Sequence, residues 1–415
     1  MLDVSTSHHW KIPAILKTWG PGLIVMLADT DAGCLITAAQ SGAQWGYTMI
    51  LPQIVLIPIL YMVQEITVRL GIVTKKGHGT LIRENFGRGW AWLAAGTLAI
   101  SSIGALLTEF AGVAGVGQLF GVSKWVTIPI ATVILIAIAF LGSYRRTEKI
   151  GILFGLGELA FIIAMLMVHP DLHAMGQGML TIPWRHSSYV YLVAANVGAV
   201  IMPWMIFYQQ SAIVDKHLAV TAIKKERHDT FFGTLLTQGI MLVFIITFAA
   251  TLYHSGAHRP LGTVVEMANG LAPFLGTWPT RILLGVSMLG GAMVAALVVA
   301  LAGTWGITEV LNWHHSLNEP FNRKSAGFYI IYVLAHVIGA VLVLVNFDIV
   351  GLAVTVEVIN ALMLPIVLGF LLVLEATALP PKYRMHGWYK WLVWILSGIV
   401  MAFGLYMIGP TLQLW

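Results

Sequence analysis

The feature of this sequence that most constrains its fold is a series of apolar stretches, each long enough to cross a lipid bilayer. A helix that spans the hydrocarbon core needs about 20 mainly apolar residues. Eleven stretches meet this requirement, at residues 20–43, 47–70, 90–119, 123–142, 150–168, 189–213, 230–253, 280–311, 326–345, 351–375 and 391–412. Because a spanning segment must satisfy its own backbone polar groups, we predict an all-α polytopic membrane protein.

The composition agrees with this prediction and excludes several classes of protein. Hydrophobic residues make up 58% of the chain and charged residues only 10%, whereas soluble domains carry about 25% charged residues. This balance excludes a soluble enzyme, a disordered scaffold and a nucleic-acid-binding domain. Cys34 is the single cysteine, which excludes an intramolecular disulfide and a zinc site built from several cysteines.

The basic residues predict the orientation of the spans. With the N-terminus in the cytoplasm, 19 of the 23 Lys and Arg residues fall in cytoplasmic segments, as the positive-inside rule requires. With eleven spans, the C-terminus would then lie outside. The polar N-terminal segment lacks the short apolar core of a signal peptide, so we expect an unprocessed protein of a prokaryotic inner membrane.

Two of the predicted spans contain interruptions near their middle. The first has Asp29 and Asp31 about a dozen residues into the span, followed by Gly33. A charged residue at that depth costs at least about 2.5–3.5 kcal/mol unless a partner compensates it. The sixth span has Pro203, with Gly198 just before it, and proline removes a helical hydrogen bond. We therefore predict two broken helices.

The interruptions fall in the first spans of two five-span halves. Because five is odd, the halves have opposite orientations, and paired breaks in inverted repeats indicate the central site of a transporter. We predict one domain, 1–415, with inverted repeats at 20–168 and 189–375 and an extra helix at 391–412. The simpler alternative is a proline kink together with a buried, neutral aspartate.

The residues near the breaks are typical of a cation site. Asp31 offers a hard, anionic oxygen, and unwound backbone frees carbonyl oxygens. Met202 offers a thioether and Cys34 a thiol. Oxygen ligands alone suit Mg²⁺, Ca²⁺ or Mn²⁺, whereas sulfur ligands shift the preference towards softer metals.

Other ionisable residues also lie within the predicted spans. Glu65 and Arg69 are four positions apart, so we predict an ion pair between them. Asp29 and Glu158 have no partner that the sequence identifies, and their roles stay open.

Several motifs together resemble those of the natural-resistance-associated macrophage protein (Nramp) family of divalent metal transporters. They are Gly20-Pro21-Gly22, Asp31-Ala32-Gly33-Cys34, Thr108-Glu109-Phe110, Ala199-Val200-Ile201-Met202-Pro203-Trp204 and Leu364-Pro365. The resemblance covers nearly the whole chain. It implies a fold similar to the amino-acid-transporter type, with two inverted five-helix repeats.

The resemblance also implies a set of metal ligands. The ligand aspartate of the family falls at Asp31, and its backbone-carbonyl ligands fall at Ala28 and Ala199. The thioether ligand falls at Met202, and the position of the family's asparagine is occupied by Cys34.

Three positions depart from the pattern of the family or bear on proton movement. Trp204 stands where the family has a histidine associated with proton transfer, and Glu357 falls where the family has a glutamine. Glu109 matches the family's acidic residue in the third span and is the predicted proton-path residue. Altered ligands of this kind resemble a divergent branch of the family that handles magnesium without tight proton coupling.

We therefore predict a divalent metal cation transporter of the Mn²⁺/Fe²⁺ class that moves ions inward by alternating access, with proton coupling left open. The alternatives are an uncoupled Mg²⁺ transporter and an organic-solute symporter on the same fold. Asp31 opposes the symporter because it would repel a substrate carboxylate. The sequence contains no H-E-x-x-H or G-x-S-x-G motif, and we expect no enzyme activity. We expect a monomer in the lipid bilayer, with the metal ion as substrate and no cofactor.

Overall fold

The protein is described by a computed structural model that covers residues 20–141, 143–256, 261, 263–345 and 349–411. Over these ranges the chain forms helices and connecting turns and contains no strand. The predicted all-α class is confirmed for this part of the chain.

The α-helices follow one another along the chain with these bounds: α1 (Pro21–Asp29), α2 (Ala32–Trp45), α3 (Ile50–Thr74), α4 (His78–Phe86), α5 (Arg88–Leu119), α6 (Lys124–Ala139), α7 (Tyr144–Gly155), α8 (Ala160–Met167), α9 (Leu172–Gly178), α10 (Ser187–Val200), α11 (Pro203–Asp215), α12 (Ile223–Phe248), α13 (Val264–Leu275), α14 (Thr277–Leu311), α15 (Ala326–Val345), α16 (Ile349–Ala378), α17 (Gly387–Tyr406) and α18 (Ile408–Thr411). Short 3₁₀ turns lie at η2 (Gly46–Met49), η3 (Leu156–Leu159), η4 (Val220–Ala222) and η6 (Pro381–Tyr383). A π-helical turn, η5 (Ala249–Tyr253), extends α12.

Both predicted interruptions are present. Thr30 ends α1 with φ −82° and ψ 48°, and Asp31 is extended at φ −67° and ψ 172° before α2 begins. In the sixth predicted span, Ile201 and Met202 leave helical geometry between α10 and α11. Pro203 then occupies the first turn of α11, where its missing N–H costs no hydrogen bond.

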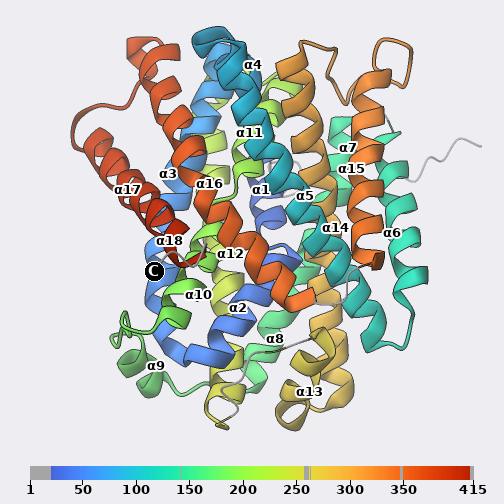
Figure 1. Ribbon diagram of the computed structural model, residues 1–415, viewed down its shortest axis with the longest axis vertical. Coiled ribbons are helices and arrows are strands. Elements are labelled where there is room, and N and C mark those ends of the chain that lie inside the picture. Colours follow the sequence, from blue (N-terminus) through green and yellow to red (C-terminus); the bar gives the residue numbers. More distant parts are fainter. Residues whose placement is uncertain (1–19, 142, 257–260, 262, 346–348, 412–415) are drawn as a thin grey trace, which may run out of the picture.

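The broken helices occupy the middle of the bundle, and continuous helices surround them. Figure 1 shows α1, α2, α10 and α12 in the centre, α6 and α15 along one side and α17 along the other. Every residue of α1 is buried, whereas α6 exposes Trp125 and Val133, and α17 exposes Trp391 and Ile399. Exposed apolar side chains on the outer helices fit contact with lipid tails, which are as apolar as leucine.

Nine helices among the described residues are long and apolar enough to cross a bilayer. The run Ala32–Thr74 counts once, although η2 separates α2 from α3 and Gly46 has φ +58°. Helix α6 has 16 residues and falls just short in length. The predicted count of eleven spans therefore stays a prediction.

The predicted ion pair between Glu65 and Arg69 is confirmed and belongs to a larger cluster. Arg69 Nη2 lies 2.7 Å from Glu65 Oε2, and Arg69 Nη1 lies 3.4 Å from Glu375 Oε1. Arg227 Nε approaches the other Glu65 oxygen at 2.9 Å. The four side chains join α3, α12 and α16 next to the central helices.

The close approach of α10 to α16 requires a glycine. A Cβ atom at Gly198 would lie only 1.7 Å from the backbone oxygen of Glu357. Overpacking typically costs about 1–3 kcal/mol, so we expect Gly198→Ala to lower the melting temperature of the detergent-purified protein. In Gly239→Ala, the matched control on α12, the new Cβ atom meets nothing within 4 Å. Equal destabilisation of both variants would contradict this packing argument.

Candidate metal centre

The N-terminus of α2 is closed by two carboxylates. Asp31 is the N-cap residue, and its Oδ1 accepts a hydrogen bond from Cys34 N at 2.7 Å. Glu109, from α5, accepts one from Ala32 N at 3.1 Å through Oε2. Free N–H groups and the helix dipole both favour anions at this end of a helix. The break in the first span therefore gathers negative charge.

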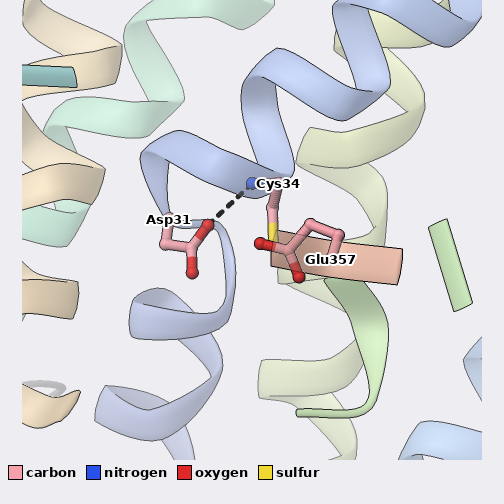
Figure 2. Close-up of side chains that lie close together, drawn as sticks. All are labelled: Asp31, Cys34 and Glu357. Carbon is pink, nitrogen blue, oxygen red and sulfur yellow. Dashed lines mark hydrogen bonds between the residues drawn. The ribbon is translucent and has the colours of Figure 1, made fainter. Parts of the chain in front are cut away.

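A third carboxylate completes a compact cluster of ligand-type side chains. Ligand atoms of Asp31, Cys34 and Glu357 all lie within 4.8 Å of one another, and all three residues are fully buried. Figure 2 shows the Glu357 carboxylate next to the Cys34 thiol, with Asp31 across from them at the gap between the two half-helices. Asp31 Oδ2 and Glu357 Oε1 have no hydrogen-bond partner among the described residues.

Such a cluster requires positive charge. None of the ion pairs among the described residues includes Asp31 or Glu357. Burying an uncompensated carboxylate is very costly in a medium of low dielectric constant. A divalent cation or protons would compensate the charge, and the unpartnered oxygens are the atoms available to bind them.

The Glu357 side chain is held in place by polar neighbours that the sequence analysis missed. Asn360 Nδ2 donates to Glu357 Oε2 at 3.0 Å, and Ser101 Oγ donates to Asn360 Oδ1 at 2.7 Å. Asn360 lies three positions after Glu357 in an apolar span, so the helical period could have identified it. Ser101 comes from a distant segment and gives no such signal.

Gly33 is the residue that lets Glu357 approach the break. A Cβ atom on Gly33 would lie 2.7 Å from Glu357 Oε1, 3.1 Å from Thr108 Oγ1 and 3.2 Å from Asp31 Oδ1. Any larger residue would push these oxygens apart. The sequence identifies Gly33 as a helix breaker, whereas its packing role depends on the position of α16.

The remaining sequence-predicted ligands lie on both broken helices. The Cys34 thiol donates to the carbonyl oxygen of Ala199 at 3.1 Å, which brings the end of α10 to the cluster. Met202 is the N-cap residue of α11, and its Sδ accepts a hydrogen bond from Trp204 Nε1 at 3.1 Å. Ala28 is fully buried in the last turn of α1.

The predicted proton-path residue borders the cluster. Glu109 binds the first N–H of α2 through Oε2, while Thr108 Oγ1 lies 3.1 Å from its Oε1. It is fully buried. Glu109 thus contacts the backbone N–H of Ala32, the residue that follows Asp31 in the chain.

The donor set combines hard and soft atoms. Two carboxylates and a backbone carbonyl are ligands that Mg²⁺, Ca²⁺ and Mn²⁺ prefer, and a thiol adds affinity for softer transition metals. Apolar helices that are interrupted beside a buried anionic site are typical of integral membrane transporters. A family model described as natural resistance-associated macrophage protein-like matches residues 22–409, and the chain belongs to this Nramp family.

Similar proteins agree with this membership. A divalent metal cation transporter MntH of Yersinia pestis (strain Pestoides F) is 29% identical over 308 residues, 72% of this chain and 74% of the relative. A crystal structure of the Eremococcus coleocola manganese transporter has a TM-score of 0.76 at 18% identity, covering 99% of this chain and 89% of that one. A Na⁺-coupled sialic acid symporter has a TM-score of 0.65 at 14% identity, covering 94% and 89%. The predicted amino-acid-transporter type of fold is confirmed.

Because Asp31 is an N-cap residue, two variants that both remove its charge should differ in melting temperature. Asparagine also caps helices well, whereas replacing an N-cap aspartate by alanine costs about 0.5–2 kcal/mol. We expect Asp31→Asn to keep or raise the melting temperature, because repulsion with Glu357 falls, and Asp31→Ala to lower it. The melting temperatures of both variants are measured by heating the protein and monitoring the folded fraction by size-exclusion chromatography. A lower melting temperature for Asp31→Asn than for Asp31→Ala would contradict the capping geometry.

Proposed function

We propose that this protein is a divalent metal cation transporter that binds its ion between the two broken helices. The observation that carries the proposal is the buried cluster of Asp31, Cys34 and Glu357, in which two carboxylate oxygens have no hydrogen-bond partner among the described residues. Its place at the break of the first span supports a transported rather than a resident ion. The names of the relatives, a divalent metal cation transporter and a manganese transporter, support the same substrate class.

The proposed ligand set extends beyond the three clustered side chains. We include the carbonyl oxygens of Ala28 and Ala199 and the thioether of Met202. The 3.1 Å contact between Cys34 Sγ and the Ala199 oxygen supports the inclusion of the Ala199 carbonyl. For Met202, binding requires the thioether to leave the indole N–H of Trp204.

We favour a transition metal of the Mn²⁺/Fe²⁺ class as the cargo. Mg²⁺ prefers oxygen ligands and keeps several waters, so a site for Mg²⁺ would not use the Cys34 thiol as a ligand. The alternative, an uncoupled Mg²⁺ transporter, is favoured by the second carboxylate from Glu357. An organic-solute symporter is opposed by the anionic cluster, which would repel a substrate carboxylate.

The proposed mechanism is alternating access with inward movement of the ion. The repeats 20–168 and 189–375 would enclose the site, and the pairs α1–α2 and α10–α11 would tilt against the surrounding helices to open each side in turn. The burial of the cluster supports a stage of this cycle at which the ion is closed off from both sides. Movement of protons with the metal would use Glu109, since Trp204 cannot carry a proton.

We further propose a monomer in a prokaryotic cell membrane, with the N-terminus in the cytoplasm and the C-terminus outside. The distribution of basic residues supports this orientation. The bacterial source of the relatives supports the membrane.

Uptake into proteoliposomes tests the proposed site. We expect wild-type protein to take up Mn²⁺ and Asp31→Asn to lose uptake by more than about 100-fold, beyond the loss typical of removing an outer-sphere partner. Glu266→Gln, an exposed acidic residue at the start of α13, is the matched control and should transport normally. Normal uptake by Asp31→Asn would refute the site, and absence of wild-type Mn²⁺ and Mg²⁺ uptake would refute the function.

Replacing the Cys34 thiol tests which class of metal the site prefers. Cys34→Ser exchanges a soft sulfur for a hard oxygen of similar size, so we expect the Kd for Mn²⁺ to rise about tenfold and that for Mg²⁺ to stay unchanged. Calorimetric titration of both ions measures the two constants. An unchanged preference would remove the thiol from the ligand set. Wild-type transport of Mg²⁺ without internal acidification would favour the magnesium alternative.

A further inference from the structure

Glu158 is a buried carboxylate that the proposed metal site does not use. It lies in η3, the 3₁₀ turn that interrupts the helical run between α7 and α8. A 3₁₀ stretch in the middle of a helix often marks a functional hinge. Glu158 is fully buried, and its Oε1 has no hydrogen-bond partner in the part of the chain that the structure describes.

The other carboxylate oxygen contacts the break in the first span. The hydroxyl of Thr30, the residue between α1 and Asp31, donates to Glu158 Oε2. Thr30 Oγ1 also lies 3.1 Å from the carbonyl oxygen of Leu27, so one hydroxyl connects Glu158 to the last turn of α1. Glu158 therefore contacts the segment that carries Asp31, and it makes this contact through Thr30.

Helix α14 also packs against Thr30 and Glu158. A Cβ atom at Gly291 would lie 2.5 Å from Thr30 O and 3.6 Å from Glu158 Oε1, so the backbone of α14 packs directly on both residues. Ser287 Oγ donates to the backbone oxygen of Glu158 at 3.2 Å. Helix α14 therefore packs against this turn close to the Oε1 atom.

Two other carboxylates, Asp29 and Asp31 on the broken span, act electrostatically on Glu158. Helix α14 approaches it with the Ser287 hydroxyl and with glycine backbone. No ion pair among the described residues includes Glu158. Ionised Glu158 would be an uncompensated buried charge, and one proton on Oε1 would remove that charge.

We propose that Glu158 is a proton-binding site at the hinge of the first span, separate from the metal cluster. Proton binding and release at Glu158 change the charge held against Thr30 and so bias the position of the α1 end. The site itself stands on these contacts, whereas its coupling to transport rests on the proposed function. The proposal gives the protein a proton-binding residue other than Glu109, on a different helix.

Infrared difference spectroscopy tests the site without transport. Titration of the purified protein should show the carbonyl band of a protonated carboxylic acid, and Glu158→Gln should lose one component of it. Glu158→Asp keeps a titratable group and should retain the component with a shifted frequency. Thr30→Val removes only the hydroxyl partner and should shift the same component. An unchanged spectrum in correctly folded Glu158→Gln would overturn the proposal.

Proteoliposomes loaded with a pH dye test the coupling. In wild type we expect metal uptake to be accompanied by acidification, and in Glu158→Gln we expect uptake to continue with loss of acidification. Glu266→Gln is the control and should retain both. Acidification by Glu158→Gln at the wild-type ratio would overturn coupling at this residue, as would a requirement for Na⁺ in place of a pH gradient. Failure of the metal-transport proposal gives a different result, because wild type would then take up no metal.

Discussion

The structure depends on one constraint, that polar backbone groups inside a membrane protein must find partners within the protein. Interrupting the first span frees N–H groups at the start of α2. Asp31 and Glu109 accept hydrogen bonds from Cys34 N and Ala32 N, so the carboxylates that close the helix end also create the anionic site. The break and the candidate metal centre therefore share the same two carboxylates.

Glycine residues bring the other helices to this break. Gly33 admits the Glu357 carboxylate, Gly198 admits the α16 backbone, and Gly291 admits the Thr30 carbonyl. Each contact would be blocked by a single methyl group. Close helix packing thus places two further carboxylates, Glu357 and Glu158, against one unwound segment. Their surroundings differ, since Glu357 lies beside a thiol and Glu158 contacts a hydroxyl and a backbone.

Much of this arrangement was predictable from the sequence. The apolar stretches indicated the helical membrane fold, and the pairs Asp31 with Gly33 and Gly198 with Pro203 indicated where two spans break. The chemistry of Asp31 and Cys34 indicated a cation. Glu357 came into the predicted site only through the resemblance to the Nramp family, because its span has no break that would draw attention to it.

The sequence by itself determined the class of fold, the positions of the breaks and the ligand types, since these follow from hydrophobicity, proline and glycine geometry, and charge in a short segment. Only the tertiary structure decided which side chains meet. Cys34 binds the Ala199 carbonyl across 165 positions, and Thr30 binds Glu158 across 128. The reason is physical: such contacts depend on how the helices pack, and no local pattern encodes the helix that will lie beside a given residue.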